Sequence, residues 1–337
     1  MAKGLRIAVV GATTTAGKEI IRVLEERDFP VGTLLPLETK GSLGNTVQYW
    51  QEDLPVQDVT GASFTGVDIA FFAAAEKVSG EFAGEAARRG CAVVDTSPRF
   101  RMDEDVPLVV PEINSHAIAG HAGIIASPSP AAVQAALVLS PIHKAAGVRK
   151  AVLSTYQAVS DMGEAALNEL TEQIADLFNF RETQSAVFRH QMAFNVIPQT
   201  GDFLENAYTA DEMSIVEETR KILEDESIRM SATTVLVPLY YCHSQSVNIE
   251  TSKKISPEKV RALLKKSPGL KVEDDPAAGI YPLAVYTAGK DECFVGRIRQ
   301  DLSAENGIVL WSVSDNIRKG TAINAVQIAE HLISMER

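Results

Sequence analysis

The sequence opens with an apolar run that leads directly into a glycine-bounded turn. Residues 5–10 are expected to form a buried strand, and Gly11 and Gly17 enclose a turn before a helix with apolar residues at helical spacing. Such a turn constrains the fold strongly, because its N–H groups and the helix dipole can hold a phosphate. It therefore predicts a strand–helix unit that binds a dinucleotide, and a tight turn without any ligand is the alternative.

Strand and helix patterns alternate over the first part of the chain. Apolar runs predict further strands at residues 33–37, 67–73, 92–95 and 123–126, and an Ala-rich segment predicts a helix at residues 79–89. Alternation of this kind implies a parallel sheet with right-handed crossover helices. This part is thus predicted to be an α/β, Rossmann-type doubly wound domain.

The pattern changes after Pro130. Segments rich in Val and Thr predict strands, and apolar stripes predict helices. The expected strands are residues 148–156, 231–238 and 245–251, and the expected helices are residues 162–178, 211–225 and 316–335. This order indicates an α+β domain built on a second sheet.

Composition and charge exclude several classes of protein. The chain has 337 residues, enough for about two domains. Its net charge is −12 without a cluster of Lys or Arg, which argues against nucleic acid and an anionic membrane as partners. No apolar run approaches the roughly 20 residues of a membrane span, and the first strand leaves no room for a signal peptide. Three widely spaced cysteines suggest reduced thiols in a cytoplasmic protein and no metal site.

Eight sequence motifs occur along nearly the whole chain in an order that is similar to one known family. They are Val9–Gly17, Phe100–Asp103, Val106–Glu112, Ser154–Ser160, Phe194–Gln199, His243–Ser244, Val295–Arg299 and Asp315–Gly320. The chain resembles the aspartate-β-semialdehyde dehydrogenase family. The resemblance implies that the last helix returns to the first domain, so that the NAD(P)-binding domain covers residues 1–129 and 316–337. It also implies a substrate and dimerisation domain over residues 130–315, and a homodimer.

The resemblance further implies where a nucleotide, NADP or NAD, would bind. Thr14 replaces the family's middle glycine, and its side chain can crowd a pyrophosphate or donate a hydrogen bond to it. The Arg that contacts the 2′-phosphate in NADP-dependent members falls on Gly41, although Lys40 or Ser42 can take its place. The cofactor-binding positions implied by the resemblance are Gly11, Thr13, Thr14, Thr15, Ala16, Gly17, Ser42 and Asn316.

One position departs from the family's chemistry. When the apolar run before it is aligned with the family, the nucleophilic Cys falls on Pro130, which has no nucleophilic atom. Pro130 suits the first turn of a helix, with Ser129 as the N-cap. Ser127 or Ser129 as a substitute nucleophile is the alternative, although a serine hydroxyl needs a positioned base. A substitute cysteine is disfavoured, because Cys242 and His243 would point to opposite faces of a strand.

Other positions of the family's site are retained. The resemblance implies that His243 is the general base and that Gln157 orients the substrate. Arg101 corresponds to a residue of the family's phosphate-binding set. The alternatives are a hydrogen-bonded structural role for His243 and an ion pair with a nearby Asp for Arg101.

The substrate-binding charges are altered. Leu236 stands where the family has the Arg that clamps the substrate carboxylate, and Ser214 stands where it has a Lys for phosphate. Asp211 corresponds to the acid that contacts the substrate amine. Reductive dephosphorylation of aspartyl phosphate is therefore not expected.

Two functions follow from this pattern. The first is a pseudoenzyme-type family member without the catalytic cysteine, which acts by binding or regulation as a homodimer or with an active relative. The second is an NAD(P)-dependent oxidoreductase of the semialdehyde dehydrogenase type that acts on a different, less charged substrate. In the second, His243 and Gln157 serve a non-covalent mechanism. The sequence favours the first.

Overall fold

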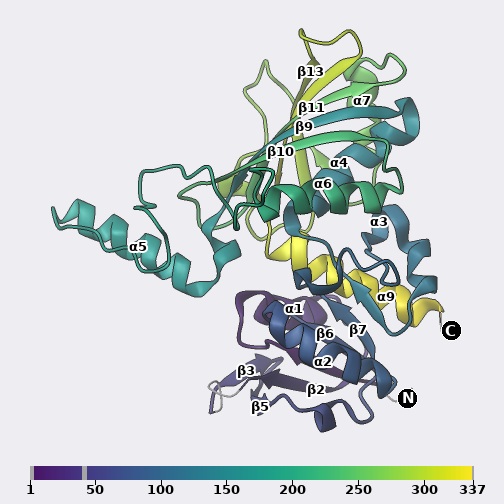
Figure 1. Ribbon diagram of the computed structural model, residues 1–337, viewed down its shortest axis with the longest axis vertical. Helices are drawn as coiled ribbons and strands as arrows, with labels where there is room; N and C mark the ends of the chain where they lie inside the picture. The colour runs from purple at the N-terminus through teal and green to yellow at the C-terminus, as the bar shows by residue number, and fades with distance from the viewer. Residues whose placement is uncertain (1–3, 40–43, 336–337) are drawn as a thin grey trace. The chain divides into compact units, whose positions relative to one another are not determined.

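The computed structural model describes residues 4–39 and 44–335. The chain divides into two compact units, which are described separately below (Figure 1). Unit 1 runs up to Ser129 and resumes at Gly320, and unit 2 covers Pro130–Lys319. Unit 2 therefore extends four residues beyond the boundary at 315 that the sequence suggested, and Asn316 lies within it.

Unit 1 is built on a parallel sheet. Its strand order is β5-β2-β1-β6-β7-β8, and every neighbouring pair runs parallel. The strands are β1 (Leu5–Val10), β2 (Val31–Glu38), β5 (Gln57–Asp58), β6 (Ile69–Phe72), β7 (Ala92–Asp95) and β8 (Ile124–Ala126). A separate hairpin of β3 (Thr46–Tyr49) and β4 (Glu52–Pro55) was not expected from the sequence. The predicted doubly wound α/β domain is confirmed.

Apolar side chains from both ends of the chain form the core of unit 1. The helices are α1 (Thr15–Glu26), α2 (Glu76–Arg88), the short α3 (Pro111–Asn114) and α9 (Asn324–Met335). Side chains such as Ile20 of α1 and Val326 of α9 are buried in one cluster with residues of β1. The Arg27 guanidinium also donates to the Glu330 carboxylate at 2.7 Å. These contacts place α9 in unit 1.

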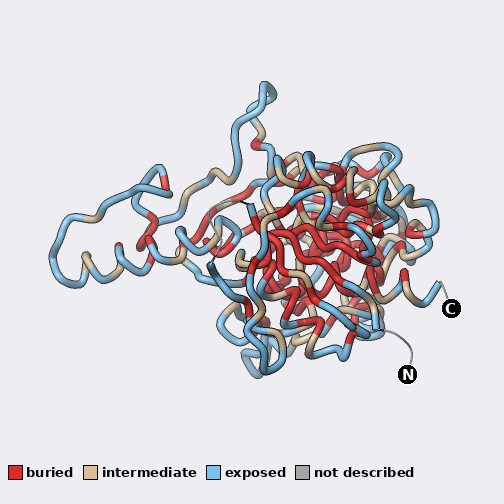
Figure 2. The backbone as a smooth tube through the Cα atoms, turned by 90° about the horizontal axis from the view of Figure 1, so that it is seen from below, coloured by how far each residue is buried: buried red, intermediate tan, exposed pale blue. Residues whose placement is uncertain are grey.

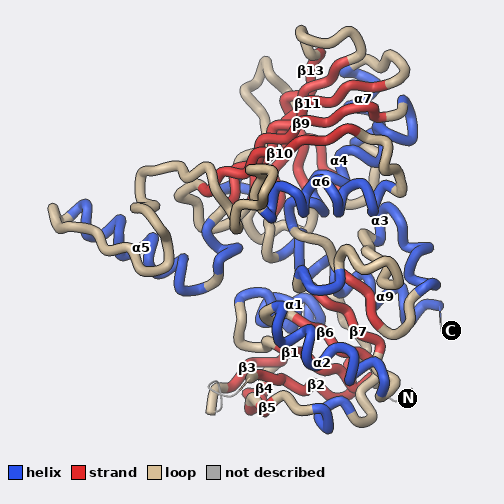
Figure 3. Tube along the Cα trace, viewed as in Figure 1, coloured by secondary structure: helices blue, strands red, loops and turns tan. Residues whose placement is uncertain are grey.

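Unit 2 is built on a mixed sheet. Its strand order is β10-β9-β11-β14-β13-β12. The strands are β9 (Val148–Gln157), β10 (Arg229–Leu236), β11 (His243–Thr251), β12 (Leu270–Val272), β13 (Cys293–Gln300) and β14 (Gly307–Ser314). β10 pairs with β9 in parallel, whereas β11 is antiparallel to both β9 and β14. Figure 3 shows β9, β10, β11 and β13 as strands of this sheet. The helices are α4 (Pro130–Ala146), α5 (Glu164–Phe178), α6 (Ala210–Leu223), α7 (Pro257–Leu264) and α8 (Ala284–Thr287).

Helices cover one face of the unit 2 sheet. α4, α6 and α7 lie against that face (Figure 1), and α4 is buried along almost its whole length. Gln245 of β11 donates its side-chain amide to the Ala131 carbonyl at 2.9 Å, and Gln134 of α4 donates to Ser312 at 2.9 Å. Side chains alternate along each strand, so the opposite face carries the more exposed Tyr156 and Trp311, whose rings lie 5.5 Å apart.

Two buried side chains of α5 hold the loop that follows it. Figure 2 shows that this helix and its loop are largely exposed, with a few buried residues. The Glu169 carboxylate accepts hydrogen bonds from the N–H groups of Ala186 and Val187 at 3.0 and 2.5 Å. The side-chain oxygen of Gln173 accepts a hydrogen bond from the Met192 N–H at 2.8 Å. The loop conformation therefore depends on two polar residues of the helix.

Replacing Glu169 with Ala is expected to loosen this loop. The change leaves part-buried N–H groups without an acceptor, and amide exchange at residues 186–188 should accelerate by about 10- to 100-fold. Hydrogen exchange followed by mass spectrometry measures this rate. Glu172→Ala, at an exposed position of the same helix, is the matched control. Equal protection of the loop in both variants would contradict the assignment.

Candidate functional site

Thr14 closes the turn between β1 and α1. Its hydroxyl accepts a hydrogen bond from the Gly17 N–H at 3.0 Å and lies 2.8 Å from the Gly11 carbonyl and 3.0 Å from the Ala73 carbonyl. Gly11 has φ +83°, and a Cβ there would lie 2.3 Å from the Ala73 oxygen, so only glycine fits. The Thr14 hydroxyl is thus the N-cap of α1 and is bonded to the turn itself.

The rest of the turn contacts the Glu38 carboxylate through Thr13 and contains two backbone N–H groups that a ligand could bind. The N–H and the hydroxyl of Thr13 donate to Oε1 of Glu38 at 3.1 and 2.6 Å. The N–H groups of Thr15 and Ala16 have no acceptor within residues 4–39 and 44–335. Free donors in the first turn of a helix are the groups that a phosphate accepts, so the turn fits a dinucleotide. Ser42, with its neighbours 40, 41 and 43, lies outside the described residues.

Arg101 is buried in unit 1 and donates to two backbone carbonyls. These are the carbonyls of Thr96 at 2.7 Å and Ser127 at 3.2 Å. Burial raises the pKa of the nearby Asp95 carboxyl, against hydrogen bonds from Ser97 and Ser79 and the charge of Arg101. Arg101 therefore holds the segment just before Pro130 in place.

Three candidate residues of unit 2 meet at one edge of its sheet. Gln157 is the last residue of β9, Leu236 is the last residue of β10, and His243 is the first residue of β11. Gln157 and Leu236 are direct partners in the parallel pair. All three lie on the helix-covered face and are at most 4 % exposed. Residues that are far apart in the sequence are thus brought together.

The two ring nitrogens of His243 have different environments. Nδ1 accepts a hydrogen bond from the Ala158 N–H at 3.1 Å, so the proton of the neutral ring lies on Nε2. Nε2 is buried, has no hydrogen-bond partner within the described parts of the chain, and lies 3.8 Å from Oδ1 of Asp161. In this arrangement the ring can donate a hydrogen bond at Nε2. Asp161 was not identified from the sequence, although it follows Gln157 by only four residues.

A cavity of about 500 Å³ opens beside this edge. Gln157 and Leu236 line it, together with three carboxylates, two basic side chains and several apolar groups. The charged residues are Asp161, Asp202, Asp211, Arg189 and His190. Leu236 thus presents an aliphatic surface at the position of the family's clamping Arg, and Asp211 also lines the cavity.

The position of Asp211 is set by the start of α6. Thr209 and Glu212 form a reciprocal capping box there, and the second oxygen of Glu212 accepts the Thr234 N–H of β10 at 2.9 Å. Ser214, one turn further on, donates its hydroxyl to Glu218 within the same helix.

Asn316 is buried and belongs to unit 2, whereas the Gly11–Gly17 turn belongs to unit 1. Its side chain accepts the Cys242 N–H at 3.1 Å and donates to the Ser160 hydroxyl at 3.0 Å. Cys242 has φ +75° and precedes β11. It therefore does not lie in the same strand as His243, contrary to the expectation from the sequence. Asn316 therefore holds the backbone next to His243.

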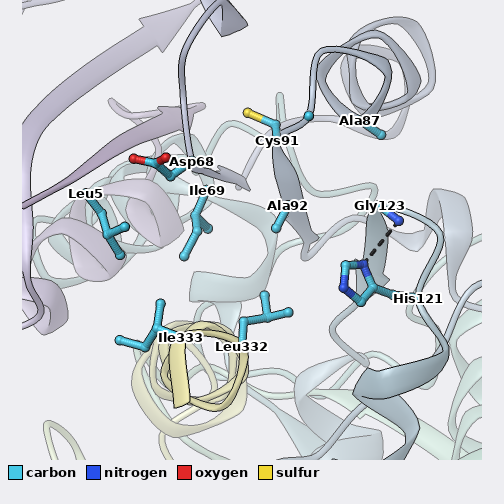
Figure 4. A pocket seen from close by; sticks show the side chains of 11 residues that line it. Leu5, Asp68, Ile69, Ala87, Cys91, Ala92, His121, Gly123, Leu332 and Ile333 are labelled. Carbon is cyan, nitrogen blue, oxygen red and sulfur yellow. Dashed lines mark hydrogen bonds between the residues drawn. The ribbon is translucent and has the colours of Figure 1, made fainter. Parts of the chain in front are cut away.

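A second cavity, of about 270 Å³, lies in unit 1 (Figure 4). Asp68, Cys91 and His121 line it, and the His121 ring accepts the Gly123 N–H at 3.1 Å. The cavity lies at the amino ends of β1, β6 and β7. Nucleotides bind at the carboxyl ends of such strands, so this cavity is not the expected cofactor site.

None of the helices in the described residues is long and apolar enough to span a membrane. No group of three or more His, Cys, Asp or Glu side chains within those residues could hold a metal ion.

Comparison with known proteins gives full-length matches. Residues 6–121 match the semialdehyde dehydrogenase NAD binding domain, and residues 139–319 match the semialdehyde dehydrogenase dimerisation domain. The chain is 45% identical to an aspartate-semialdehyde dehydrogenase of Legionella pneumophila, covering 98% of this chain and 96% of the relative. It is 43% identical to that of Bacillus subtilis, covering 98% of each. It is also similar to aspartate semialdehyde dehydrogenase II complexed with ASA from Vibrio cholerae (TM-score 0.96, 40% identity, 99% of both chains).

The interpretation of the chain as a non-catalytic pseudoenzyme is wrong. Its full-length relatives at over 40% identity are named as the dehydrogenase, and one similar structure is complexed with ASA. The interpretation equated the missing thiol at Pro130 with the loss of all chemistry. A missing thiol removes only the covalent acyl route, whereas His243 and Gln157 remain at the sheet edge.

The three cysteines are expected to be unreactive in the folded protein. Cys91, Cys242 and Cys293 are buried, and burial raises the pKa of each thiol to about 12. At a pH of about 8 only about one thiol in ten thousand is then ionised. Iodoacetamide followed by mass spectrometry should label none of them in the native protein and all three after unfolding in urea. Rapid native labelling of any one thiol would reveal a substitute nucleophile.

Proposed function

Because the chain belongs to the aspartate-semialdehyde dehydrogenase family, we propose that it is an NAD(P)-dependent oxidoreductase of the semialdehyde dehydrogenase type that acts on a less charged aldehyde. The observation that carries this proposal is the buried Nε2–H of His243, which has no hydrogen-bond partner within the described residues. It lies 3.8 Å from Asp161, which lines the cavity beside Gln157 and Leu236. A fixed, desolvated donor of this kind polarises a carbonyl oxygen.

The turn of unit 1 holds the cofactor in this proposal. The N–H groups of Thr15 and Ala16, together with the dipole of α1, bind the pyrophosphate. Gly11 and Gly17 have no Cβ atom, so the backbone of the turn can come close to the pyrophosphate. When bound, the nicotinamide supplies the hydride acceptor: a hydrated aldehyde that loses one hydride and one proton becomes a carboxylic acid.

The side chains of unit 2 handle the substrate oxygen and the proton. His243 donates from Nε2 to the substrate oxygen, and Gln157 orients the carbon that reacts. The Asp161 carboxylate accepts the hydroxyl proton of the hydrated aldehyde, because it is the charged group next to Nε2. Pro130 has no nucleophilic atom, so the reaction proposed for this chain proceeds without a thioester at that position. No step requires a cysteine.

The cavity favours a substrate without a carboxylate at the clamping position. Leu236 is 4 % exposed and can make no hydrogen bond to an anion. Asp161, Asp202 and Asp211 outnumber the two basic groups of the cavity. Because like charges repel most strongly in a site with little water, an amine-bearing or uncharged aldehyde fits better than an acidic one. Asp211 then contacts the substrate amine.

We also propose that the protein is a homodimer. The chain contains the family's dimerisation domain. The face of the unit 2 sheet opposite α4, α6 and α7 carries aromatic side chains, among them the exposed Tyr156 and the half-buried Trp311. Tyr281 and Leu283 extend this apolar surface beside Trp311. Aromatic residues in such a surface are typical anchors of an interface.

Three free, buried cysteines suit a reducing, cytoplasmic compartment.

A substrate panel tests the proposed activity. The purified protein, incubated with NAD or NADP, should reduce the nicotinamide faster with 3-aminopropanal or propanal than with aspartate semialdehyde. His243→Gln should lower kcat by about 100- to 1,000-fold, as loss of one positioned donor to a reacting oxygen does. His331→Gln, on the exposed side of α9, is the matched control and should leave kcat unchanged. Absence of turnover with every aldehyde would refute the proposal.

Sedimentation tests the proposed dimer surface. The wild-type chain should sediment as a dimer at micromolar concentration. Trp311→Glu places a charge in the surface and should raise the dimer dissociation constant by about 100-fold or more, as loss of a central aromatic anchor does. Leu302→Glu, at a 99 % exposed turn position, is the control. A wild-type monomer, or equal dissociation of the two variants, would overturn this assignment.

A further inference from the structure

We infer that the protein prefers NAD to NADP and that Glu38 is the residue that sets this preference. The inference rests on the proposed function in one respect, because it takes the turn of unit 1 as the nucleotide site. It goes further by choosing between two cofactors that the family match leaves open. The supporting observations are the place of Glu38 in the sheet, its hydrogen bonds and its charge.

Glu38 ends the strand next to the nucleotide-binding turn. It is the last residue of β2, which pairs in parallel with β1 so that Leu37 lies opposite Val10. The turn begins at Gly11, directly after Val10, and both strands therefore end at the same carboxyl edge. In dinucleotide-binding folds an acidic residue about 20 positions after the glycine-rich turn hydrogen-bonds the ribose 2′-hydroxyl. Glu38 lies at that distance from Gly17.

Hydrogen bonds from two threonines fix the carboxylate. Oε1 of Glu38 accepts the N–H and the hydroxyl of Thr13, and Oε2 accepts the Thr39 N–H at 3.3 Å. The side chain is 8 % exposed, so it is held rather than free in solvent. A carboxylate has about four acceptor sites. These contacts use three of them, and Oε2 keeps capacity for one further donor.

The charge of Glu38 distinguishes the two cofactors. A ribose 2′-hydroxyl is a donor and can satisfy Oε2, whereas the 2′-phosphate of NADP is an anion with no proton to donate at neutral pH. The two negative groups would repel each other at contact distance. The charge of Glu38 therefore acts against NADP.

Calorimetric titration of the full chain with NAD and NADP side by side tests the inference. The wild-type protein should bind NAD about tenfold to a hundredfold more tightly, the range expected for one hydrogen bond to a charged group. Glu38→Ser should reduce that ratio to about one, chiefly by tightening NADP. Glu38→Gln, which keeps the size of the side chain, should reduce the ratio in the same direction if the serine variant is unstable. ADP against adenosine 2′,5′-bisphosphate repeats the comparison without the nicotinamide.

Thr13→Val is the matched control. It removes one hydrogen bond to Glu38 but keeps the carboxylate, so it should weaken NAD and NADP together and leave their ratio unchanged. A wild-type protein that binds NADP as tightly as NAD would overturn the inference, while the proposed oxidoreductase activity would stand. An unchanged ratio in both Glu38 variants would overturn the role of Glu38. Flat titrations with both nucleotides would overturn the inference and the proposed function together.

Discussion

The pairing of β9 with its two neighbours is the interaction on which the unit 2 site depends. β10 runs parallel to β9, and β11 runs antiparallel to it. The C-terminal ends of β9 and β10 and the N-terminal end of β11 therefore lie side by side at one edge of the sheet, across the strand ends. Gln157, Leu236 and His243 share that edge and its helix-covered face for this reason. A slip of one residue in either pairing would turn these side chains to the opposite face. The buried helix α4 behind the sheet keeps water away and so increases the effect of each polar group.

Hydrogen bonds with two loops fix the position and the tautomer of the His243 ring. The Ala158 N–H occupies Nδ1, and the side chain of Asn316 holds the N–H of Cys242, the residue before the ring. The proton of the neutral imidazole is thereby placed on Nε2, beside Asp161. A ring held in this way is suited to polarising an oxygen, and a covalent intermediate is not needed for that. This is the physical reason why the loss of a thiol at Pro130 and a retained catalytic role are compatible.

The sequence predicted elements that are governed by local pattern and missed features that depend on distant contacts. β1 forms at residues 5–10 as expected, because an apolar run bounded by Gly11 has one stable solution there. The last helix was expected from residue 316, yet α9 begins at Asn324, after a π-helical segment over Arg318–Ile323 that the apolar pattern does not distinguish from an α-helix. Asp161 and Glu38 were missed as site residues, because their roles arise from contacts with His243 and Thr13 that no local pattern reveals.

Two positions share one electrostatic consequence. Leu236 stands where the family has a cation that binds a carboxylate, and Glu38 holds a carboxylate beside the turn that binds the cofactor in our proposal. Each lowers the affinity of its own unit for a negatively charged partner, whereas Pro130 removes only the nucleophile. The net charge of −12 acts in the same direction at longer range. Leu236 in unit 2 and Glu38 in unit 1 thus favour the same kind of ligand, one with less negative charge, as the proposed substrate and cofactor have.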